Sequence, residues 1–178
     1  FQYRLMVADW DGYGAVEVYK SWQPLLSPNW SPDGSKLAFV SFADSGPIVQ
    51  MIELATGKAQ TIADFKGVNA APAWSPDGRK IAYSTSRHGS PDIYIYDLVS
   101  GQHERATTHW GIDTEPAWSP RGDSLLFTSN RSRKPQIYSY SLNDQTVSRM
   151  TFEGDENANA SFDPVSYTHL RAHETCGH

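Results

Sequence analysis

The sequence has a single cysteine, Cys176, close to its C-terminal end. All residues before it therefore lack a disulfide and a thiol nucleophile, which is compatible with an oxidising compartment. The serine-hydrolase elbow G-x-S-x-G, the zinc-protease pair H-E-x-x-H and the Walker phosphate loop are also missing from the sequence. Since no known catalytic motif remains, we expect a protein that is not an enzyme and that has no cofactor.

Long apolar runs and clusters of basic residues are missing as well. No run approaches the roughly 20 apolar residues that a transmembrane helix needs. The net charge is −5 and the basic residues are scattered singly, which argues against nucleic acid or an anionic membrane as a partner. The first residues, FQYRLMVADWDG, show neither an initiator methionine nor a signal peptide, so we expect the chain to begin inside a folded region.

What the sequence does contain is an internal repeat. SPNWSPDGSKLAFVSF, APAWSPDGRKIAYSTS and EPAWSPRGDSLLFTSN align without gaps, and NASFDP opens a fourth copy. The copies begin at Ser27, Ala71, Glu115 and Asn159. A second register of apolar residues has the same spacing of 44 residues, at Leu5, Val49, Ile93 and Ile137. Two independent registers with one period indicate a repeat architecture.

Within each copy the local signals are those of strands and turns. The segment Ser-Pro-Asp-Gly at 75–78 fits a type I turn, with proline at its second position and glycine at its fourth. KIAYSTS and DIYIYDL are rich in β-branched and aromatic residues, and no segment shows a helical period. Four short strands in about 44 residues match one blade of a β-propeller. The sequence therefore predicts an all-β fold of four-stranded antiparallel blades, with the repeat tryptophans buried alike.

The phase of the repeat divides the chain into blades. Residues 1–22 form a partial blade, 23–66, 67–110 and 111–154 form whole blades, and 155–164 form the start of another. This fragment of about three and a half blades predicts an open arc rather than a closed ring. Because both ends would leave unpaired strand edges, we expect the natural protein to continue on both sides.

The C-terminal stretch departs from the repeat. It contains four side chains of the kind that zinc prefers, His169, His173, Cys176 and His178. After residue 164 the repeat predicts a glycine, a basic residue and an apolar strand, but the chain reads VSYTHLRAHET instead. Back-translation of residues 165–175 gives DNA that is identified as the adapter of transposon-based sequencing libraries. We therefore expect residues 165–178 to be a non-native tail without a defined place in the blade and without a metal site.

The segments that enter the innermost strands are the candidate functional surface, because they converge at one mouth of the propeller channel. These segments are QPLLSP (23–28), GVNAAP (67–72), GIDTEP (111–116) and DENANA (155–160). Their residues differ between copies whereas the flanking tryptophan and proline recur, which favours a specialised rim over ordinary loop drift. The candidate partner-binding residues are Val68, Asn69, Ala70, Ala71, Asp113, Thr114, Glu115 and Asn157. Small side chains leave room for a partner there, and polar ones offer it hydrogen bonds.

Other chemistry-bearing residues have simpler interpretations. The stretch Asp-Trp-Asp-Gly at 9–12 is similar to the start of a calcium loop, but Lys20 stands where that loop needs a glutamate, so we expect a turn. His88, His103 and His109 occupy unrelated positions of the repeat. We therefore expect them to be surface or hydrogen-bonded loop residues rather than a catalytic or metal-binding set.

The motif WSPDG-x-K-[IL]-A resembles the propeller repeats of the TolB family. The resemblance covers residues 1–164 and includes ADWDGY at 8–13, QPL-x-SP-x-WSPDGSKLA at 23–38, TEP-x-W at 114–118 and TFEG-x-x-N-A at 151–158. It implies a periplasmic component of the Tol-Pal system, with a six-bladed propeller and a separate N-terminal α/β domain outside this chain. It also implies a role in outer-membrane integrity and in constriction at cell division.

The same resemblance implies partners. The peptidoglycan-associated lipoprotein Pal would bind at the propeller mouth around Asn69, Ala71 and Thr114, TolA would bind an N-terminal segment outside this chain, and some colicins would exploit the protein. Val68 departs from the family pattern, in which relatives can carry a polar ring. The alternative is the propeller domain of a prolyl-oligopeptidase-type serine peptidase, which shares the WSPDG repeats. A G-x-S-x-G elbow after the propeller would favour that alternative.

Overall fold

The computed structural model describes residues 1–162 and 170–174, and every regular element in them is a β-strand. The first sheet pairs β1 (Tyr3–Val7) with β2 (Val16–Ser21). Blade I contains β3 (Leu26–Trp30), β4 (Lys36–Ala43), β5 (Gly46–Glu53) and β6 (Lys58–Ala63). Blade II contains β7 (Asn69–Trp74), β8 (Lys80–Thr85), β9 (Asp92–Asp97) and β10 (His103–Arg105). Blade III contains β11 (Asp113–Trp118), β12 (Ser124–Ser132), β13 (Lys134–Ser141) and β14 (Thr146–Arg149), and the last sheet pairs β15 (Asn157–Phe162) with β16 (Leu170–Glu174).

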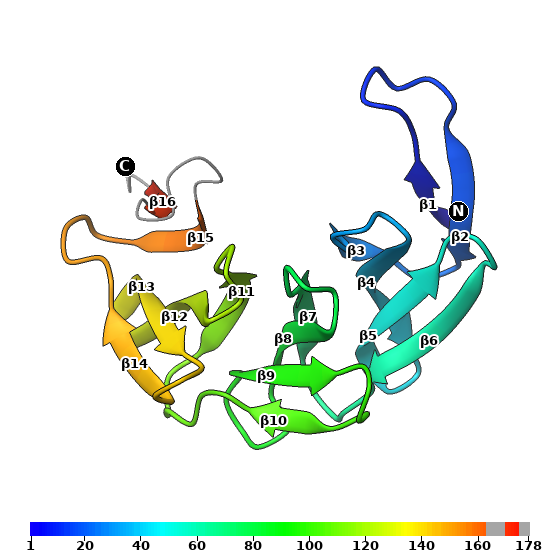
Figure 1. The fold of residues 1–178 in the computed structure, drawn as a ribbon. Helices are drawn as coiled ribbons and strands as arrows, with labels where there is room; N and C mark the ends of the chain where they lie inside the picture. The colour runs from blue at the N-terminus through cyan, green and yellow to red at the C-terminus, as the bar shows by residue number, and fades with distance from the viewer. Residues whose placement is uncertain (163–169, 175–178) are drawn as a thin grey trace.

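The sheets follow one another along an open arc, with the first strand of each blade on its inner side (Figure 1). In every blade, strands consecutive in sequence pair antiparallel. This arrangement confirms the predicted class, a β-propeller fragment of four-stranded antiparallel blades. None of the described residues forms a helix that is long and apolar enough to cross a membrane.

The repeated Ser-Pro-Asp-Gly turn joins the first and second strands of a blade. In blade II the amide of Gly78 donates to the carbonyl of Ser75 at 2.9 Å, and Gly78 adopts a φ of 69°, which glycine reaches without strain. The Ser75 hydroxyl donates to Asp77 Oδ1 at 2.6 Å, and this bond is the main reason why the pKa of Asp77 is lowered. The turn is thus held by its own side chains, which explains why its sequence recurs.

The core lies between blades rather than within one of them. Val40 and Val49 of blade I form a cluster with Trp74 and Tyr83 of blade II, and a second cluster joins blades II and III in the same way. Each blade therefore has an apolar face toward each neighbour. Such a blade cannot bury its apolar surface alone, and stacking along the arc supplies the hydrophobic stabilisation.

The prediction that the repeat tryptophans are buried alike was wrong. Trp74 is 8% exposed, Trp118 is half-buried and Trp30 is 46% exposed. Trp74 packs against blade I, and the indole of Trp118 donates to the carbonyl of Ala73 at 3.0 Å, so each ring leans on the blade before it. The sheet before Trp30 contains only β1 and β2, which correspond to the outer strands of a blade, and its ring lacks the inner strands as a packing surface.

The tail also departs from its prediction. Residues 170–174 form β16, which pairs antiparallel with β15, so the expectation of no defined place is wrong for these five residues. The pairing joins Asn157 to Glu174 and Phe162 to Leu170. Strand pairing uses backbone N–H and C=O groups, so an extended segment can satisfy the open edge of β15 without the side chains of the repeat. Residues 163–169 and 175–178 lie outside the described part of the chain.

Candidate interaction site at the channel mouth

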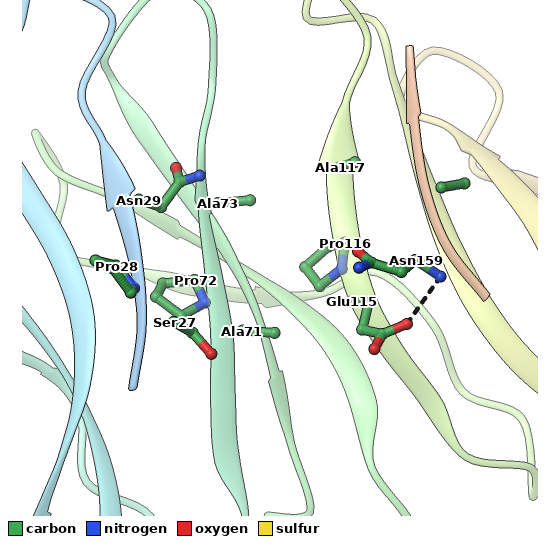
Figure 2. A pocket seen from close by; sticks show the side chains of 11 residues that line it. Ser27, Pro28, Asn29, Ala71, Pro72, Ala73, Glu115, Pro116, Ala117 and Asn159 are labelled. Carbon is green, nitrogen blue, oxygen red and sulfur yellow. Dashed lines mark hydrogen bonds between the residues drawn. The ribbon is translucent and has the colours of Figure 1, made fainter. Parts of the chain in front are cut away.

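The inner strands β3, β7, β11 and β15 line a cavity of about 290 Å³ on the inside of the arc. Its wall repeats the same three positions of the sequence in successive strands. The lining residues are Ser27, Pro28, Asn29, Ala71, Pro72, Ala73, Glu115, Pro116, Ala117, Asn159 and Ala160. Figure 2 shows these side chains facing the cavity from neighbouring strands. The wall combines small, proline and polar side chains.

A strained backbone position recurs in this wall. One residue in each inner strand has a positive φ although it is not glycine, namely Ser27 (51°), Ala71 (50°), Glu115 (55°) and Asn159 (52°). The strand register shifts there, for example between Ala70 and Ala73 of β7. A left-handed conformation costs a residue with a side chain about 1–2 kcal/mol. Each inner strand therefore contains a β-bulge that redirects its side chains into the channel.

Glu115 ties two inner strands together. Its Oε2 accepts a hydrogen bond from the Thr128 hydroxyl at 2.8 Å. It also accepts one from the Asn159 amide at 3.0 Å, which Figure 2 shows. The carboxylate thus lies in the channel wall, and one of its oxygens fixes β15 against β11. The hydrogen bond between Glu115 and the Asn159 amide therefore holds β11 and β15 in a fixed position relative to each other.

Three of the predicted binding residues are buried. Asn69, Asp113 and Asn157 are equivalent, each begins an inner strand, and none is more than 4% exposed. Asn69 Nδ2 donates to the carbonyls of Phe65 at 2.6 Å and Pro47 at 3.0 Å. The sequence assigned these side chains to hydrogen bonds with a partner, but in the structure Asn69 and Asn157 bond to the preceding blade and Asp113 pairs with Arg131 of its own blade.

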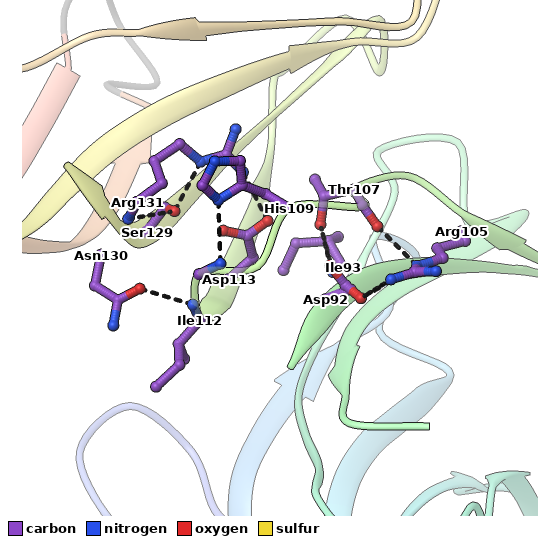
Figure 3. A network of polar contacts seen from close by, with 11 residues as sticks. Asp92, Ile93, Arg105, Thr107, His109, Ile112, Asp113, Ser129, Asn130 and Arg131 are labelled. Carbon is purple, nitrogen blue, oxygen red and sulfur yellow. Dashed lines mark hydrogen bonds and ion pairs between the residues drawn. The ribbon is translucent and has the colours of Figure 1, made fainter. Parts of the chain in front are cut away.

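Asp113 forms an ion pair within its own blade. Its Oδ2 accepts from Arg131 Nη2 at 2.7 Å, while its Oδ1 has no hydrogen-bond partner in the described part of the chain. Asp92 lies nearby and pairs with Arg105 and Thr107 (Figure 3). Burial is the main cause that raises the pKa of the Asp92 carboxyl. Two ion pairs with buried carboxylates therefore lie side by side where blades II and III meet.

The remaining predicted residues are accessible. Val68 is 43% exposed, and Ala70, Ala71, Thr114 and Glu115 are half-buried. All of them lie where the inner strands begin, so the structure brings them together at one end of the channel, the mouth.

Sequence reasoning missed the large apolar side chains at this mouth. Trp22, Trp110, Ile112 and Phe152 are exposed in the connections that lead into the inner strands. The repeat contained a signal for these residues, because large apolar side chains recur at equivalent positions of its connections. Trp22 and Trp110 occupy equivalent positions, and Ile112 is equivalent to Val68.

The histidines and the tail do not form a metal centre among the described residues. No three His, Cys, Asp or Glu side chains within 1–162 converge as metal ligands would. His103 Nδ1 is hydrogen-bonded to the Tyr83 hydroxyl at 2.9 Å, and burial lowers the pKa of His103. Of the tail residues considered for zinc, His169, Cys176 and His178 lie outside the described residues, and His173 is described only through the backbone of β16.

Comparison with known proteins places this fold in a family. A family model described as the TolB beta propeller domain matches residues 1–175. The chain belongs to the TolB β-propeller family. Tol-Pal system protein TolB of Xylella fastidiosa (strain M12) is 50% identical over 70 residues, which are 39% of this chain and 16% of that protein. The TolB of Xanthomonas oryzae pv. oryzae (strain PXO99A) is 49% identical over the same length.

Solved structures agree with the family. The crystal structure of TolB from Acinetobacter baumannii superposes with a TM-score of 0.84 at 42% identity, over 90% of this chain and 40% of that chain. This chain thus spans well under half of the length of that TolB. A puromycin-hydrolysing peptidase of Mycobacterium tuberculosis (TM-score 0.71, 17% identity, 86% of this chain and 25% of that chain) is similar in fold alone.

Proposed function

We propose that this protein is a non-enzymatic interaction component of the Tol-Pal system in the periplasm, and that it binds the lipoprotein Pal at the channel mouth. Membership of the TolB family supports the system. The location of the exposed apolar side chains supports the mouth as the binding face. The same proposal includes contact with TolA through a segment outside this chain. It also includes use by colicins and roles in outer-membrane integrity and cell division.

The observation that carries the proposal is the set of large apolar residues exposed beside the channel wall. They are Trp22, Val68, Trp110, Ile112 and Phe152, all in the connections that lead into the inner strands. The opposite end of the described chain also exposes such residues, among them Trp10 and Tyr13 in the β1–β2 turn, Trp30 at the end of β3, and Val99. Exposed apolar groups that gather on a surface mark an interaction site. A mouth with a fixed channel wall and an apolar rim fits a protein partner.

The rival is the propeller of a serine peptidase. Two solved neighbours are a puromycin hydrolase and a puromycin-hydrolysing peptidase, but their identities of 13% and 17% carry only the fold. The Acinetobacter TolB is far closer in sequence at 42%. The sequence of the complete gene tests this choice, because the rival requires a G-x-S-x-G elbow in a hydrolase domain.

Substitutions at the mouth test the binding face. Ala71→Tyr fills the channel wall and Thr114→Arg places a charge at its entrance. We expect each to weaken Pal binding by about 1–3 kcal/mol, the range of a disturbed interface anchor, with the melting temperature nearly unchanged. Val99→Arg is the matched control at the opposite end. Isothermal titration with purified Pal measures the three affinities, and a loss confined to Val99→Arg would contradict the proposal.

A further inference from the structure

The connection between β10 and β11 exposes two large apolar residues on either side of a buried glycine. Trp110 is 71% exposed and Ile112 is 48% exposed, whereas Gly111 between them is buried. A Cβ on Gly111 would stand 2.9 Å from Asn130 Oδ1 and 3.1 Å from the amide nitrogen of Arg131. The backbone of this loop therefore lies directly against the end of β12, and only glycine allows that approach.

Hydrogen bonds fix the loop in this position. The Gly111 amide donates to His109 Nδ1 at 3.1 Å, and the Ile112 amide donates to Asn130 Oδ1 at 2.7 Å. The Asn130 amide donates back to the carbonyl of Ile112 at 3.3 Å. Figure 3 shows the Ile112 side chain pointing away from these contacts. The loop thus holds its two apolar side chains in a defined place in front of the blade.

The base of the loop is anchored in the interior. The amide of Asp113 donates to the carbonyl of Pro91 at 2.8 Å, and its carboxylate pairs with Arg131, whose side chain is 13% exposed. The Arg131 guanidinium also lies 4.7 Å from the centre of the Tyr138 ring. Because these charges are paired within the chain, the loop presents apolar rather than ionic chemistry to a partner.

No other copy of the repeat has large apolar side chains at both positions. Trp22 and Pro24 stand in the connection before β3, Lys66 and Val68 in the one before β7, and Gly154 and Glu156 in the one before β15. Among these four equivalent connections, the one before β11 alone has a tryptophan followed by a large aliphatic residue at the two positions. A pre-organised loop loses little conformational entropy on binding, so its apolar contacts contribute more fully to affinity.

We propose that Trp110 and Ile112 are specificity-determining anchor residues, which dock on an apolar patch of Pal. This inference rests on the proposed function and adds to it the residues and the chemistry of the contact. The chain has a net charge of −5 and no basic cluster, which disfavours an anionic membrane as the occupant. A second copy of the chain is the competing occupant.

Titration of Pal into single variants tests the anchor. We expect Trp110→Ala to weaken binding about 10- to 100-fold and Ile112→Ala about 3- to 10-fold, as for central and flanking interface residues. Val99→Ala, an equally exposed apolar truncation at the opposite end, is expected to bind as the wild type does. Gly111→Ala keeps both anchors but displaces the loop, so it is expected to weaken binding as well. Melting temperatures of Trp110→Ala, Ile112→Ala and Val99→Ala should match the wild type.

The outcomes separate this inference from the proposed function. Wild-type protein that does not bind Pal overturns both. Pal binding that Thr114→Arg weakens while Trp110→Ala leaves it intact overturns the anchor and keeps the mouth. Concentration-dependent dimerisation that Trp110→Ala abolishes, with Pal binding unchanged, would assign the loop to contacts between copies and overturn the anchor. Weakened binding in Trp110→Ala at an unchanged melting temperature supports it.

Discussion

Replacement of Asn69 by alanine separates a structural role from a binding role at the mouth. The side chain is fully buried and takes part in three hydrogen bonds, two to the carbonyls of Pro47 and Phe65 and one from the Thr85 hydroxyl at 2.9 Å. Each neutral bond contributes about 1 kcal/mol, and a buried group left without a partner costs about 1–3 kcal/mol. We expect Asn69→Ala to lower the free energy of unfolding by about 3 kcal/mol. For a chain of this size that corresponds to a melting temperature lower by roughly 6–12 °C.

Thermal and denaturant unfolding followed by circular dichroism measure this loss. Asn143→Ala is the matched control, because Asn143 is exposed in the turn between β13 and β14 and should change stability by less than about 0.5 kcal/mol. If Asn69→Ala melts like the wild type but no longer binds Pal, the side chain contacts the partner and the anchoring role is refuted.

Three further predictions follow from burial, charge and backbone strain. Trp74→Ala should cost about 3–5 kcal/mol in denaturant unfolding and Trp30→Ala less than half of that, because only Trp74 is buried; equal losses would contradict the packing on the preceding blade. Burial raises the pKa of Asp92 above its ordinary 3.8, so its contribution to stability is present below that value and is lost as the pH rises through the folded-state pKa. Asp92→Asn should therefore make the slope of unfolding free energy against pH more positive above about pH 4, and an unchanged slope counts against the raised pKa. Ala71→Gly relieves a φ of 50° and should be neutral or stabilising by about 0.5 kcal/mol, whereas Ala70→Gly, at an ordinary φ, should cost about 1 kcal/mol; equal effects would argue against strain at the bulge.

The fold could be predicted because its determinants are local and repeated. The turn at 75–78 is specified by its own proline, glycine and serine, and its hydrogen bonds are made within six residues of sequence. The spacing of 44 residues then fixes the number of strands in each blade. Local signals that recur with one period leave few alternatives to stacked blades.

The candidate site was predicted less well because burial depends on distant residues. Asn69 looks like a rim residue in the sequence, and only the carbonyl of Pro47 on the neighbouring blade shows that its amide is used inside. Asp113 is also buried, and its carboxylate pairs with Arg131 on the next strand of its own blade. Trp110 gave the opposite error, since an apolar residue in a sequence suggests the core and only the structure shows that it faces solvent. At this mouth the polar side chain of Asn69 is therefore buried and the apolar side chain of Trp110 is exposed, the reverse of what residue type alone predicts.

The bulges of the inner strands show what a repeat imposes on its residues. Serine, alanine, glutamate and asparagine occupy the strained position in successive strands, yet their φ angles all lie between 50° and 55°. Side chains so different cannot each prefer this conformation, so the strain comes from the common geometry of the channel wall and is balanced by packing between blades. The position is therefore free to vary in chemistry without changing the backbone. Glu115 uses this freedom to tie β11 to β15, while Ala71 leaves its part of the wall open to a partner.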